Sequence, residues 1–279
     1  MKDKIIKATL DNDDEFMWGE ELSKKLELNT NFIGKNIIHL ETVDSTNDYL
    51  KKINNQVEDG TVVISDEQTK GKGRLGRKWQ SKSREGIWMS IILKPEIIPY
   101  KAPFITLIAG ASIVKALNNL QVPAKIKWPN DIIINNKKVS GILTELSADI
   151  EKTNYIIVGI GINVNNSEFD RDLKEKATSL YKEHYKLSKV DIVTEILHEL
   201  EKLYKDYIDR DCKEETLKIC KEYSAIINKN VYIVKENEKE LVRCVDINKE
   251  GNLIVRDSNN KLKEIISGEV SIRGVKGYV

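Results

Sequence analysis

Residues 131–146 have the sequence DIIINNKKVSGILTEL, and this stretch decides the fold class. Two apolar runs, Asp131–Ile134 and Val139–Leu146, are separated by the short polar turn Asn135–Lys137. A connection this short forms a hairpin, in which the two strands pair antiparallel. Because a doubly wound parallel sheet needs long crossovers between its strands, the stretch favours an α+β fold with a mixed, largely antiparallel sheet.

Further strand and helix signals surround this hairpin. Short runs of β-branched and apolar residues, typical of strands, occur at 37–40, 61–65, 86–93, 124–128 and 155–162. Apolar residues at helical spacing predict helices at 46–53, 102–119 and 189–208. Residues 1–30 are charged, contain one short helical candidate, Gly19–Leu26, and are too few for an independent domain.

From residue 223 the pattern changes to short strands joined by polar turns. The strand-like runs are 231–234, 241–245, 253–255 and 263–266, with turns at 248–251 and 258–260. Several short strands at this spacing predict a small all-β module, which we expect to be a barrel. The sequence therefore predicts an N-terminal segment 1–30, a main domain 31–222 and a β-module 223–279.

Composition and charge limit the classes of function. The chain has 279 residues, of which 45 are basic and 44 acidic, for a net charge of +1. A general nucleic-acid coat is therefore disfavoured, and any cationic site must be local. No apolar run approaches the roughly 20 residues that span a bilayer, and the N-terminus is not a signal sequence, so we expect a cytoplasmic protein. The three cysteines and three histidines are scattered, which argues against a disulfide framework or a zinc site.

The most informative segment for function is the loop Gly71–Trp79, in which three glycines are interleaved with four cations. Glycine lets a backbone approach a ligand closely, and Arg and Lys donate charge-assisted hydrogen bonds to phosphate or carboxylate oxygens. The loop has the form G-x-G-x-x-G, but residues 77–86 continue polar where a dinucleotide-binding turn would open an apolar helix. It is no Walker loop, because Arg77 and Lys78 follow Gly76. The loop could instead be a solvent-exposed basic loop without a function. Three glycines at this density raise the entropy cost of folding, however, and this favours a functional loop.

Four other segments have both a structural and a functional interpretation. Asp44–Asp48 fits a helix capping box, although its hydroxyls could face a ligand. The Asn and Asp that end Lys127–Asp131 are either ordinary turn residues after a proline, or they place a functional carboxylate at the end of a strand. Lys138 is either a solvent-exposed charge on an edge strand or, if the other motifs lie near it, a catalytic group. Gly159–Asn165 is a bulged core strand, or a surface against which something flat can lie.

Taken together and in this order, these motifs resemble those of biotin protein ligases. The matching segments are Ser45–Asn47, Gln68 ahead of Gly71–Trp79, Lys127–Asp131, Lys138 ahead of Gly141–Leu143, Gly159–Asn163 and Gly268–Gly274. The resemblance covers about residues 30–279. It implies a catalytic domain like that of class II synthetases and a C-terminal SH3-like barrel. It also implies that biotin and ATP, with Mg²⁺, form biotinyl-5′-AMP, and that biotin then passes to a lysine of the biotin carboxyl carrier protein of acetyl-CoA carboxylase or a related carboxylase.

The resemblance further implies a role for each matching residue. Lys138 and Arg74 would be catalytic, and Asp131 would organise the nucleotide-bound magnesium. Biotin would be bound by Ser45, Thr46, Asn47, Gln68, Gly71, Lys72, Arg74, Trp88, Lys138, Gly141 and Gly159. ATP and the adenylate would be bound by Arg74, Arg77, Trp79, Asn130, Asp131, Asn163 and Arg273.

The sequence departs from the family pattern at two places. Lys72 stands where the best-known pattern has Arg, which predicts weaker retention of the adenylate because a bidentate contact becomes a point charge. Residues 1–30 are about half of the roughly 60 that a winged-helix module needs, so we expect at most a remnant of one and no specific operator binding. A homodimer is compatible with the resemblance.

Two other functions compete with this interpretation. A lipoate ligase or octanoyl transferase would share the catalytic fold and the lysine chemistry, but the chain lacks their Gly-Gly-Gly and His-Asp signature. A nucleic-acid-binding module would use the basic loop and the β-module on phosphates. The near-neutral net charge argues against that module.

Overall fold

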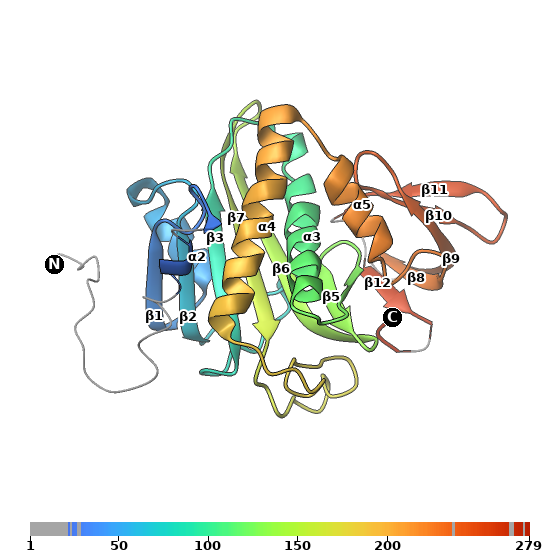
Figure 1. Ribbon diagram of the computed structural model, residues 1–279. Coiled ribbons are helices and arrows are strands. Elements are labelled where there is room, and N and C mark those ends of the chain that lie inside the picture. Colours follow the sequence, from blue (N-terminus) through green and yellow to red (C-terminus); the bar gives the residue numbers. More distant parts are fainter. Residues whose placement is uncertain (1–21, 23, 27–28, 236–237, 268–270, 276) are drawn as a thin grey trace.

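A seven-stranded sheet forms the centre of the molecule (Figure 1). The computed structural model describes residues 22, 24–26, 29–235, 238–267, 271–275 and 277–279. The strand order is β1-β2-β3-β7-β6-β5-β4, and only β1 and β2 pair parallel. This confirms the mixed, largely antiparallel α+β sheet. The strands are β1 (Ile37–Val43), β2 (Val62–Gln68), β3 (Gly86–Leu93), β4 (Lys125–Lys127), β5 (Asp131–Ile134), β6 (Lys137–Ala148) and β7 (Thr153–Asn163).

The predicted hairpin joins β5 to β6. Ile134 pairs with Lys137 across the turn, and the two turn residues, Asn135 and Asn136, have φ of 47° and 63°. Two-residue hairpin turns that match the twist of the strands need a left-handed conformation at both turn residues. Asparagine tolerates this conformation better than most residues. The hairpin therefore places Lys138 at the start of β6, opposite Ile133 of β5.

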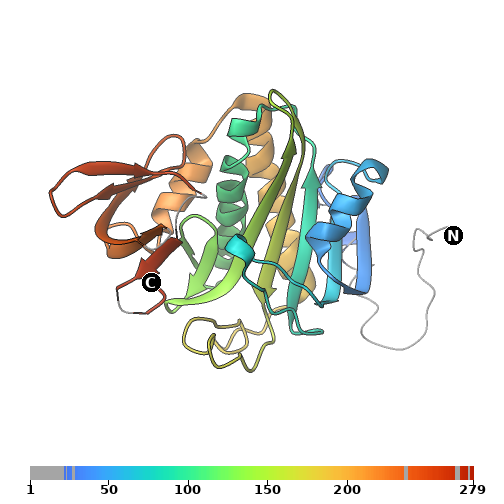
Figure 2. The same cartoon turned by 180° about the vertical axis from the view of Figure 1, so that it is seen from behind.

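Helices cover both faces of this sheet. Helices α3 (Phe104–Asn119) and α4 (Lys189–Arg210) lie on one face, and α2 (Thr46–Ile53) lies on the other (Figures 1 and 2). All three occupy the predicted segments within two residues. Helix α5 (Glu214–Glu222), which the sequence did not predict, leads into the second sheet. Single turns of 3₁₀ helix are η1 (Asn54–Gln56) and η3 (Pro99–Lys101), and η2 (Arg74–Gly76) is a tight turn in which Leu75 has φ of 56°.

Only part of the helical candidate Gly19–Leu26 belongs to the described residues. Leu22 and residues 24–26 are helical, and Leu22 and Leu26 are fully buried in the hydrophobic core. These two side chains, four residues apart, lie on one helical face. The rest of the N-terminal segment, including most of the expected winged-helix remnant, lies outside the described residues.

Helix α3 corrects the expectation that no apolar stretch reaches membrane-spanning length. Among the described residues, Pro99–Asn119 is long and apolar enough by length and composition, but 72% of its apolar window is buried inside the fold. Most of its side chains contact the sheet or α4. Its composition is therefore that of a core helix.

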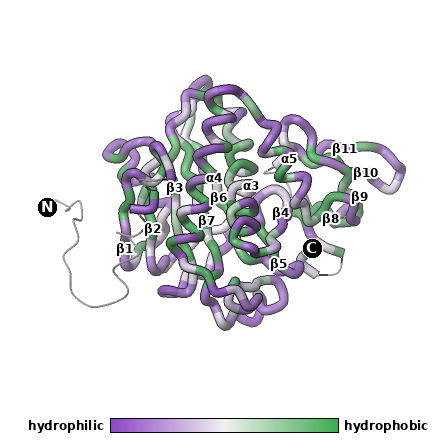
Figure 3. The backbone as a smooth tube through the Cα atoms, in the orientation of Figure 1, coloured by the Kyte–Doolittle hydropathy of each residue, from purple (hydrophilic) through white to green (hydrophobic). Residues whose placement is uncertain are grey.

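A second sheet of five strands follows α5, all paired antiparallel in the order β11-β10-β9-β8-β12. This confirms the expected C-terminal all-β module, consistent with an SH3-like fold. One hydrophobic cluster continues from α3 into this module (Figure 3). The strands are β8 (Asn230–Lys235), β9 (Glu238–Ile247), β10 (Leu253–Arg256), β11 (Leu262–Ile265) and β12 (Ser271–Gly274), the last unpredicted.

Candidate active site

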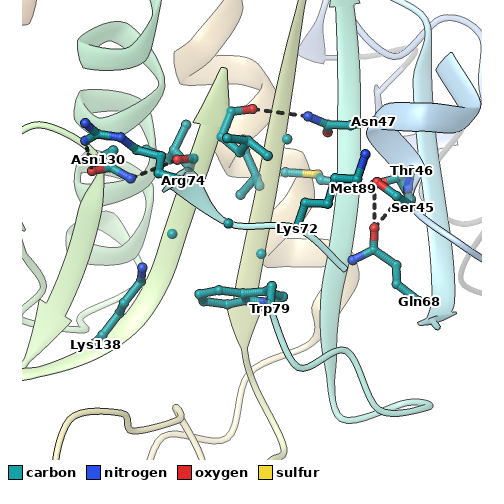
Figure 4. Close-up of a pocket in the computed structure, with 17 residues that line it drawn as sticks. Ser45, Thr46, Asn47, Gln68, Lys72, Arg74, Trp79, Met89, Asn130 and Lys138 are labelled. Atoms are coloured by element: carbon teal, nitrogen blue, oxygen red, sulfur yellow. Dashed lines mark hydrogen bonds between the residues drawn. The ribbon is translucent and has the colours of Figure 1, made fainter. Parts of the chain in front are cut away.

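A pocket opens on the face of the large sheet that carries α2, where the loop 71–79 crosses the strands (Figures 2 and 4). Its walls come from the start of α2, the end of β2, the loop, the turn before β5, and the middle of β6 and β7. Eleven of the predicted site residues line it together. They are Ser45, Thr46, Asn47, Gln68, Lys72, Arg74, Trp79, Asn130, Lys138, Gly141 and Gly159.

The loop 71–79 folds back on itself as a narrow hairpin. The Trp79 amide donates to the Gly71 carbonyl at 2.9 Å, and the Gly73 amide donates to the Arg77 carbonyl at 2.8 Å. At the tip, Leu75 and Gly76 have φ of 56° and 70°. A side chain on Gly71 would lie 2.5 Å from the Trp79 carbonyl oxygen, so this glycine closes the loop and does not line the pocket.

The indole of Trp79 lies on a platform of two glycines. Gly141 of β6 and Gly161 of β7 are cross-strand partners. A Cβ on Gly161 would lie 2.5 Å from Trp79 Nε1, and one on Gly141 would lie 3.0 Å from the same ring. The sequence predicted that something flat could lie against this strand, and the structure places an indole there. Trp79 Nε1 is buried and has no hydrogen-bond partner among the described residues, so it is available to a ligand.

One end of the pocket, at the start of α2, is lined by neutral polar side chains with Lys72 beside them. Gln68 Oε1 accepts hydrogen bonds from the Thr46 amide at 2.9 Å and the Thr46 hydroxyl at 3.1 Å. Asn47 donates to the Leu143 carbonyl at 3.3 Å, and its oxygen accepts from Ser90 at 2.6 Å. These bonds tie the first turn of α2 to β2, β3 and β6. The pocket's polar end is therefore held in one geometry before any ligand arrives.

Ser90 is a member of this network that sequence reasoning missed. Its side chain is fully buried and also contacts the Thr46 hydroxyl at 2.6 Å. A lone serine in the otherwise apolar run Gly86–Leu93 is the signal that could have found it, because a buried hydroxyl needs a partner.

The other end of the pocket is cationic. Arg74 Nη1 donates to Asn130 Oδ1 at 2.8 Å, and Asn130 Nδ2 donates to the Ile142 carbonyl at 3.0 Å. Arg74 Nη2 is buried and has no partner among the residues that the structure describes. Burial lowers the pKa of Arg74, but a guanidinium stays charged at neutral pH. The ammonium of Lys138 lies 5.0 Å from the centre of the Trp79 ring. Lys138 therefore lies near the indole, and Arg74 lies beside Asn130 in the same pocket (Figure 4).

Lys72 lies on the same pocket wall but is paired with α2. Its ammonium is 2.6 Å from a carboxylate oxygen of Asp48. Asp48 also lies 3.6 Å from Lys51, which reaches Glu145 of β6 at 2.5 Å. The loop is therefore tied to α2, and α2 to the sheet, by a row of alternating charges.

Two predicted site residues lie behind the pocket. Trp88 is fully buried, donates from Nε1 to the Lys82 carbonyl at 3.3 Å, and meets the Trp79 ring edge-on at 6.4 Å. Met89, its neighbour on β3, lines the pocket. Asn163 donates to the Thr178 carbonyl at 3.0 Å. Neither Trp88 nor Asn163 lines the pocket.

Arg77 and Arg273 lie beside the pocket, toward the C-terminal module. Arg77 Nη2 lies 3.5 Å from the hydroxyl of Ser271 on β12, and Arg273 is on the same strand. Neither side chain lines the pocket. Both are close enough to Lys127 that their charges lower its pKa.

Asp131 stands next to the pocket, with both oxygens engaged. One oxygen lies 2.5 Å from Lys138 Nζ, and the other accepts from the Tyr278 hydroxyl. Burial alone would raise the pKa of Asp131, but Lys138 and Tyr278 hold it below its ordinary value. Within the described ranges, no three His, Cys, Asp or Glu side chains form a metal-binding group.

Comparison with known proteins agrees with this geometry. The sequence model of the biotin/lipoate A/B protein ligase family matches residues 39–163, and that of the biotin protein ligase C-terminal domain matches residues 226–273. The chain is 35% identical over 250 residues to the bifunctional ligase/repressor BirA of Bacillus subtilis (strain 168). The aligned region covers 88% of this chain and 76% of that protein. The chain belongs to the biotin protein ligase family.

Solved structures of biotin protein ligases have the same fold. A biotin protein ligase from Aquifex aeolicus, in complex with biotin and ATP, is similar with a TM-score of 0.76 and 33% identity, over 86% of this chain and 99% of that one. The biotin–[acetyl-CoA-carboxylase] ligase of Mycobacterium tuberculosis is 34% identical over 129 residues, which are 44% of this chain and 45% of that protein. The match of the C-terminal domain favours a biotin ligase over the lipoate enzymes with which the catalytic domain is grouped.

Proposed function

We propose that this biotin protein ligase adenylates biotin with MgATP and transfers the biotinyl group to a lysine of a carrier protein. One observation carries the assignment of residues. Arg74, Lys138 and Trp79 line one pocket from a loop and a strand, and two of their buried donor atoms have no hydrogen-bond partner among the described residues. Buried donors without partners are rare in native proteins. They are expected where a ligand supplies the missing acceptor.

In the first step, an oxygen of the biotin carboxylate attacks the α-phosphorus of ATP. The bond between that phosphorus and the oxygen bridging to the β-phosphate breaks, and pyrophosphate leaves. The carboxylate and the triphosphate repel each other, so the site must neutralise both. Arg74 and Lys138 are placed to donate to the carboxylate and α-phosphate oxygens, where charge develops in the transition state.

The polar end of the pocket suits the polar ring system of biotin. Thr46, Asn47 and Gln68 carry donors and acceptors already fixed by their mutual hydrogen bonds. The indole of Trp79 offers a flat face for the adenine. The loop 71–79 lies across the pocket, where it would shield the mixed anhydride from water.

In the second step, the neutral amine of a carrier lysine attacks the acyl carbon of biotinyl-AMP. An amide bond forms, AMP leaves, and the amine loses a proton to solvent. The names of related ligases contain acetyl-CoA carboxylase. We therefore propose the biotin carboxyl carrier protein of such a carboxylase as the acceptor, in the cytoplasm, where ATP is available.

The magnesium ion enters with ATP in this proposal. Because both oxygens of Asp131 are engaged by Lys138 and Tyr278, the phosphates and water would supply most ligands of Mg²⁺, as is usual for this ion. Asp131 would act on the nucleotide through Lys138.

Replacing Lys138 tests the central assignment. We expect Lys138→Ala to lower the rate of biotinyl-AMP formation by a factor on the order of 100 or more, because a donor to the developing phosphoryl charge is lost. The rate is measured by mass-detected biotinyl-AMP from purified protein, biotin and MgATP. Circular dichroism and thermal unfolding report whether the variant is folded.

Lys137→Ala is the matched control. Lys137 precedes Lys138 in the hairpin, but its ammonium lies 3.4 Å from the Lys174 carbonyl at the surface. This variant should keep the wild-type rate. Near-wild-type activity of Lys138→Ala would refute the role of Lys138. Absence of biotinyl-AMP with the wild type, together with salt-sensitive RNA binding, would favour a nucleic-acid-binding module.

We propose the division between the catalytic domain and the β-module at residues 222 and 223. Helix α5 ends at Glu222, and the C-terminal family match begins at residue 226. Dimer formation and the absence of operator binding stay predictions. Sedimentation with and without biotin, and a gel shift on a palindromic site, test them.

A further inference from the structure

The segment after β12 returns to the catalytic sheet. A Cβ on Gly274 would lie 2.4 Å from the backbone of Val279, so the chain folds closely back on the end of β12. Tyr278 then packs against β4. Its carbonyl oxygen accepts a hydrogen bond from Lys127 Nζ at 2.6 Å, and the same ammonium lies 3.5 Å from the centre of the Tyr278 ring. Lys127 is only 2% exposed. This contact is a buried, specific junction between the two sheets.

The Tyr278 hydroxyl extends this junction to the pocket. It donates to one oxygen of Asp131, whose other oxygen lies 2.5 Å from the ammonium of Lys138. The side chains of Asp131 and Lys138 are 16% and 22% exposed. A continuous chain of three polar side chains therefore runs from the C-terminal segment to the lysine of the pocket wall.

These three side chains together determine where the ammonium of Lys138 lies. A lysine side chain has four rotatable bonds and three donors. Pairing with Asp131 engages one donor and leaves the others for a ligand. Asp131 can itself rotate, and a carboxylate with one free oxygen could turn to engage the ammonium more fully. The hydroxyl of Tyr278 occupies that second oxygen, which fixes the carboxylate and thereby the position of Lys138 Nζ.

We propose that Tyr278 is a positioning residue for adenylation: it fixes Asp131, which holds the Lys138 ammonium at the place where the acyl phosphate forms. This inference rests on the proposed function. It makes the C-terminal segment part of the adenylating machinery, although Tyr278 itself does not line the pocket. A displacement of about 1 Å at a reacting centre can lower a rate about 100-fold.

Tyr278→Phe is the sharpest test, because it removes one oxygen atom and keeps the ring over Lys127. We expect kcat for biotin-dependent exchange of pyrophosphate into ATP to fall about tenfold or more, the effect of losing a hydrogen bond to a charged group. The KM for biotin should stay within about twofold, since the polar end of the pocket is untouched. Uniformly weakened binding would instead raise KM and leave kcat unchanged.

Tyr207→Phe is the matched control. Tyr207 is buried, and its hydroxyl donates one hydrogen bond, to the Lys101 carbonyl at 3.0 Å; neither residue lines the pocket. We expect it to lower thermal stability about as much as Tyr278→Phe and to leave kcat at the wild-type value. If the two variants lose kcat equally, Tyr278 is merely structural and the inference is wrong.

A double-mutant cycle shows whether the effect passes through Asp131. In an Asp131→Asn background, Tyr278→Phe should change kcat by less than twofold, because residues that act as a unit are not additive. Full additivity, or wild-type kcat in Tyr278→Phe, would overturn the inference. Either result leaves the proposed function standing if the wild type makes biotinyl-AMP; if it does not, the proposed function itself fails.

Discussion

Two glycines that face each other across β6 and β7 decide where the indole of Trp79 can lie. Gly161 has an ordinary φ, so any residue could adopt its backbone conformation. What excludes a side chain is space, because a Cβ there would lie 2.5 Å from Trp79 Nε1. The same holds at Gly159, where a Cβ would lie 2.2 Å from Asn47 Oδ1. These positions need glycine for close approach and not for backbone freedom.

Gly161→Ala should therefore displace the indole without disturbing the strand. We expect the KM for ATP in pyrophosphate exchange to rise about tenfold, through loss of a stacking surface, while the KM for biotin changes less. Gly110→Ala is the control, because its Cβ would lie 3.7 Å from Ile142 Cδ1, an ordinary contact, in the middle of α3. That control should keep full activity and gain up to about 1 kcal/mol of unfolding free energy. An unchanged KM for ATP in Gly161→Ala would show that the platform does not position the nucleotide.

At the scale of elements, the loop 71–79 is a hairpin fastened at two places. Arg74 holds its tip to the turn before β5 through Asn130, and Lys72 holds its base to α2 through Asp48. The pairing of Lys72 is at the surface, where the lysine side chain is 44% exposed. Exposed ion pairs contribute little to stability, typically below about 1 kcal/mol. The Lys72–Asp48 pair is therefore a weak link between the loop and α2, and the loop base is also held by the hydrogen bond between the Trp79 amide and the Gly71 carbonyl.

Replacing Lys72 by arginine should make this fastening more persistent. A guanidinium can donate to both oxygens of Asp48 or of a ligand at once. We expect Lys72→Arg to slow the release of biotinyl-AMP by about two- to tenfold, with little effect on its formation. Stopped-flow displacement of the bound adenylate by excess biotin measures the rate. An off-rate equal to that of the wild type would contradict this expectation, and Lys70→Arg, a neighbouring surface pair with Asp44, should show no effect.

The elements differ in how far the sequence predicts them. The helix and strand patterns of 46–53, 86–93 and 131–146 have strong periodicity, and each element lies where it was expected. The parallel pairing of β1 with β2 was missed, although a strand, a helix and a strand in succession favour it. Helix α5 is only nine residues long, and such short segments are marginal by pattern alone.

The site was predictable where its residues are local to a motif. Ser45, Gln68 and Lys138 line one pocket because each lies near the end of a helix or strand that borders it. The support that Thr178 gives to Asn163 was not predictable, because it comes from a long segment without regular structure. Nor was the Asp131–Tyr278 contact, which joins residues 147 positions apart.

At the scale of the whole molecule, the two sheets share one core. The hydrophobic cluster includes α3, α4 and strands of the C-terminal module. Trp128 donates to the Gly251 carbonyl at 3.0 Å, and a Cβ on Gly251 would lie 2.4 Å from Leu107 of α3. The two parts should therefore unfold together in a single transition.

Lys127 gives this junction a pH dependence. Burial lowers the pKa of Lys127 to about 7 in the folded protein, although Asp131 partly offsets the effect. The unfolded chain keeps the ordinary value of 10.5. Between these two pH values the unfolded state binds more protons, so the unfolding free energy should rise with pH across that window. Below about pH 7 both states are protonated, and the full cost of burying the ammonium is present.

Lys127→Met should remove this dependence. We expect the stability of the variant relative to the wild type to be greatest near pH 7 and to decrease by pH 9.5, with a total change of at most a few kcal/mol. Urea unfolding at several pH values measures it. Lys125→Met, in the same strand but exposed, should leave the slope unchanged. Parallel curves for wild type and Lys127→Met would show that Lys127 stays protonated in the folded protein.

The glycine platform also limits how this pocket can change under selection. Every amino-acid replacement of Gly141 or Gly161 adds at least a β-carbon, and that atom would lie within 3.0 Å of the indole at either site. The wall beneath Trp79 therefore cannot be remodelled by a point mutation that leaves the indole in place. A competitive inhibitor that stacks on this indole would meet few resistance mutations at the platform that spare the natural nucleotide.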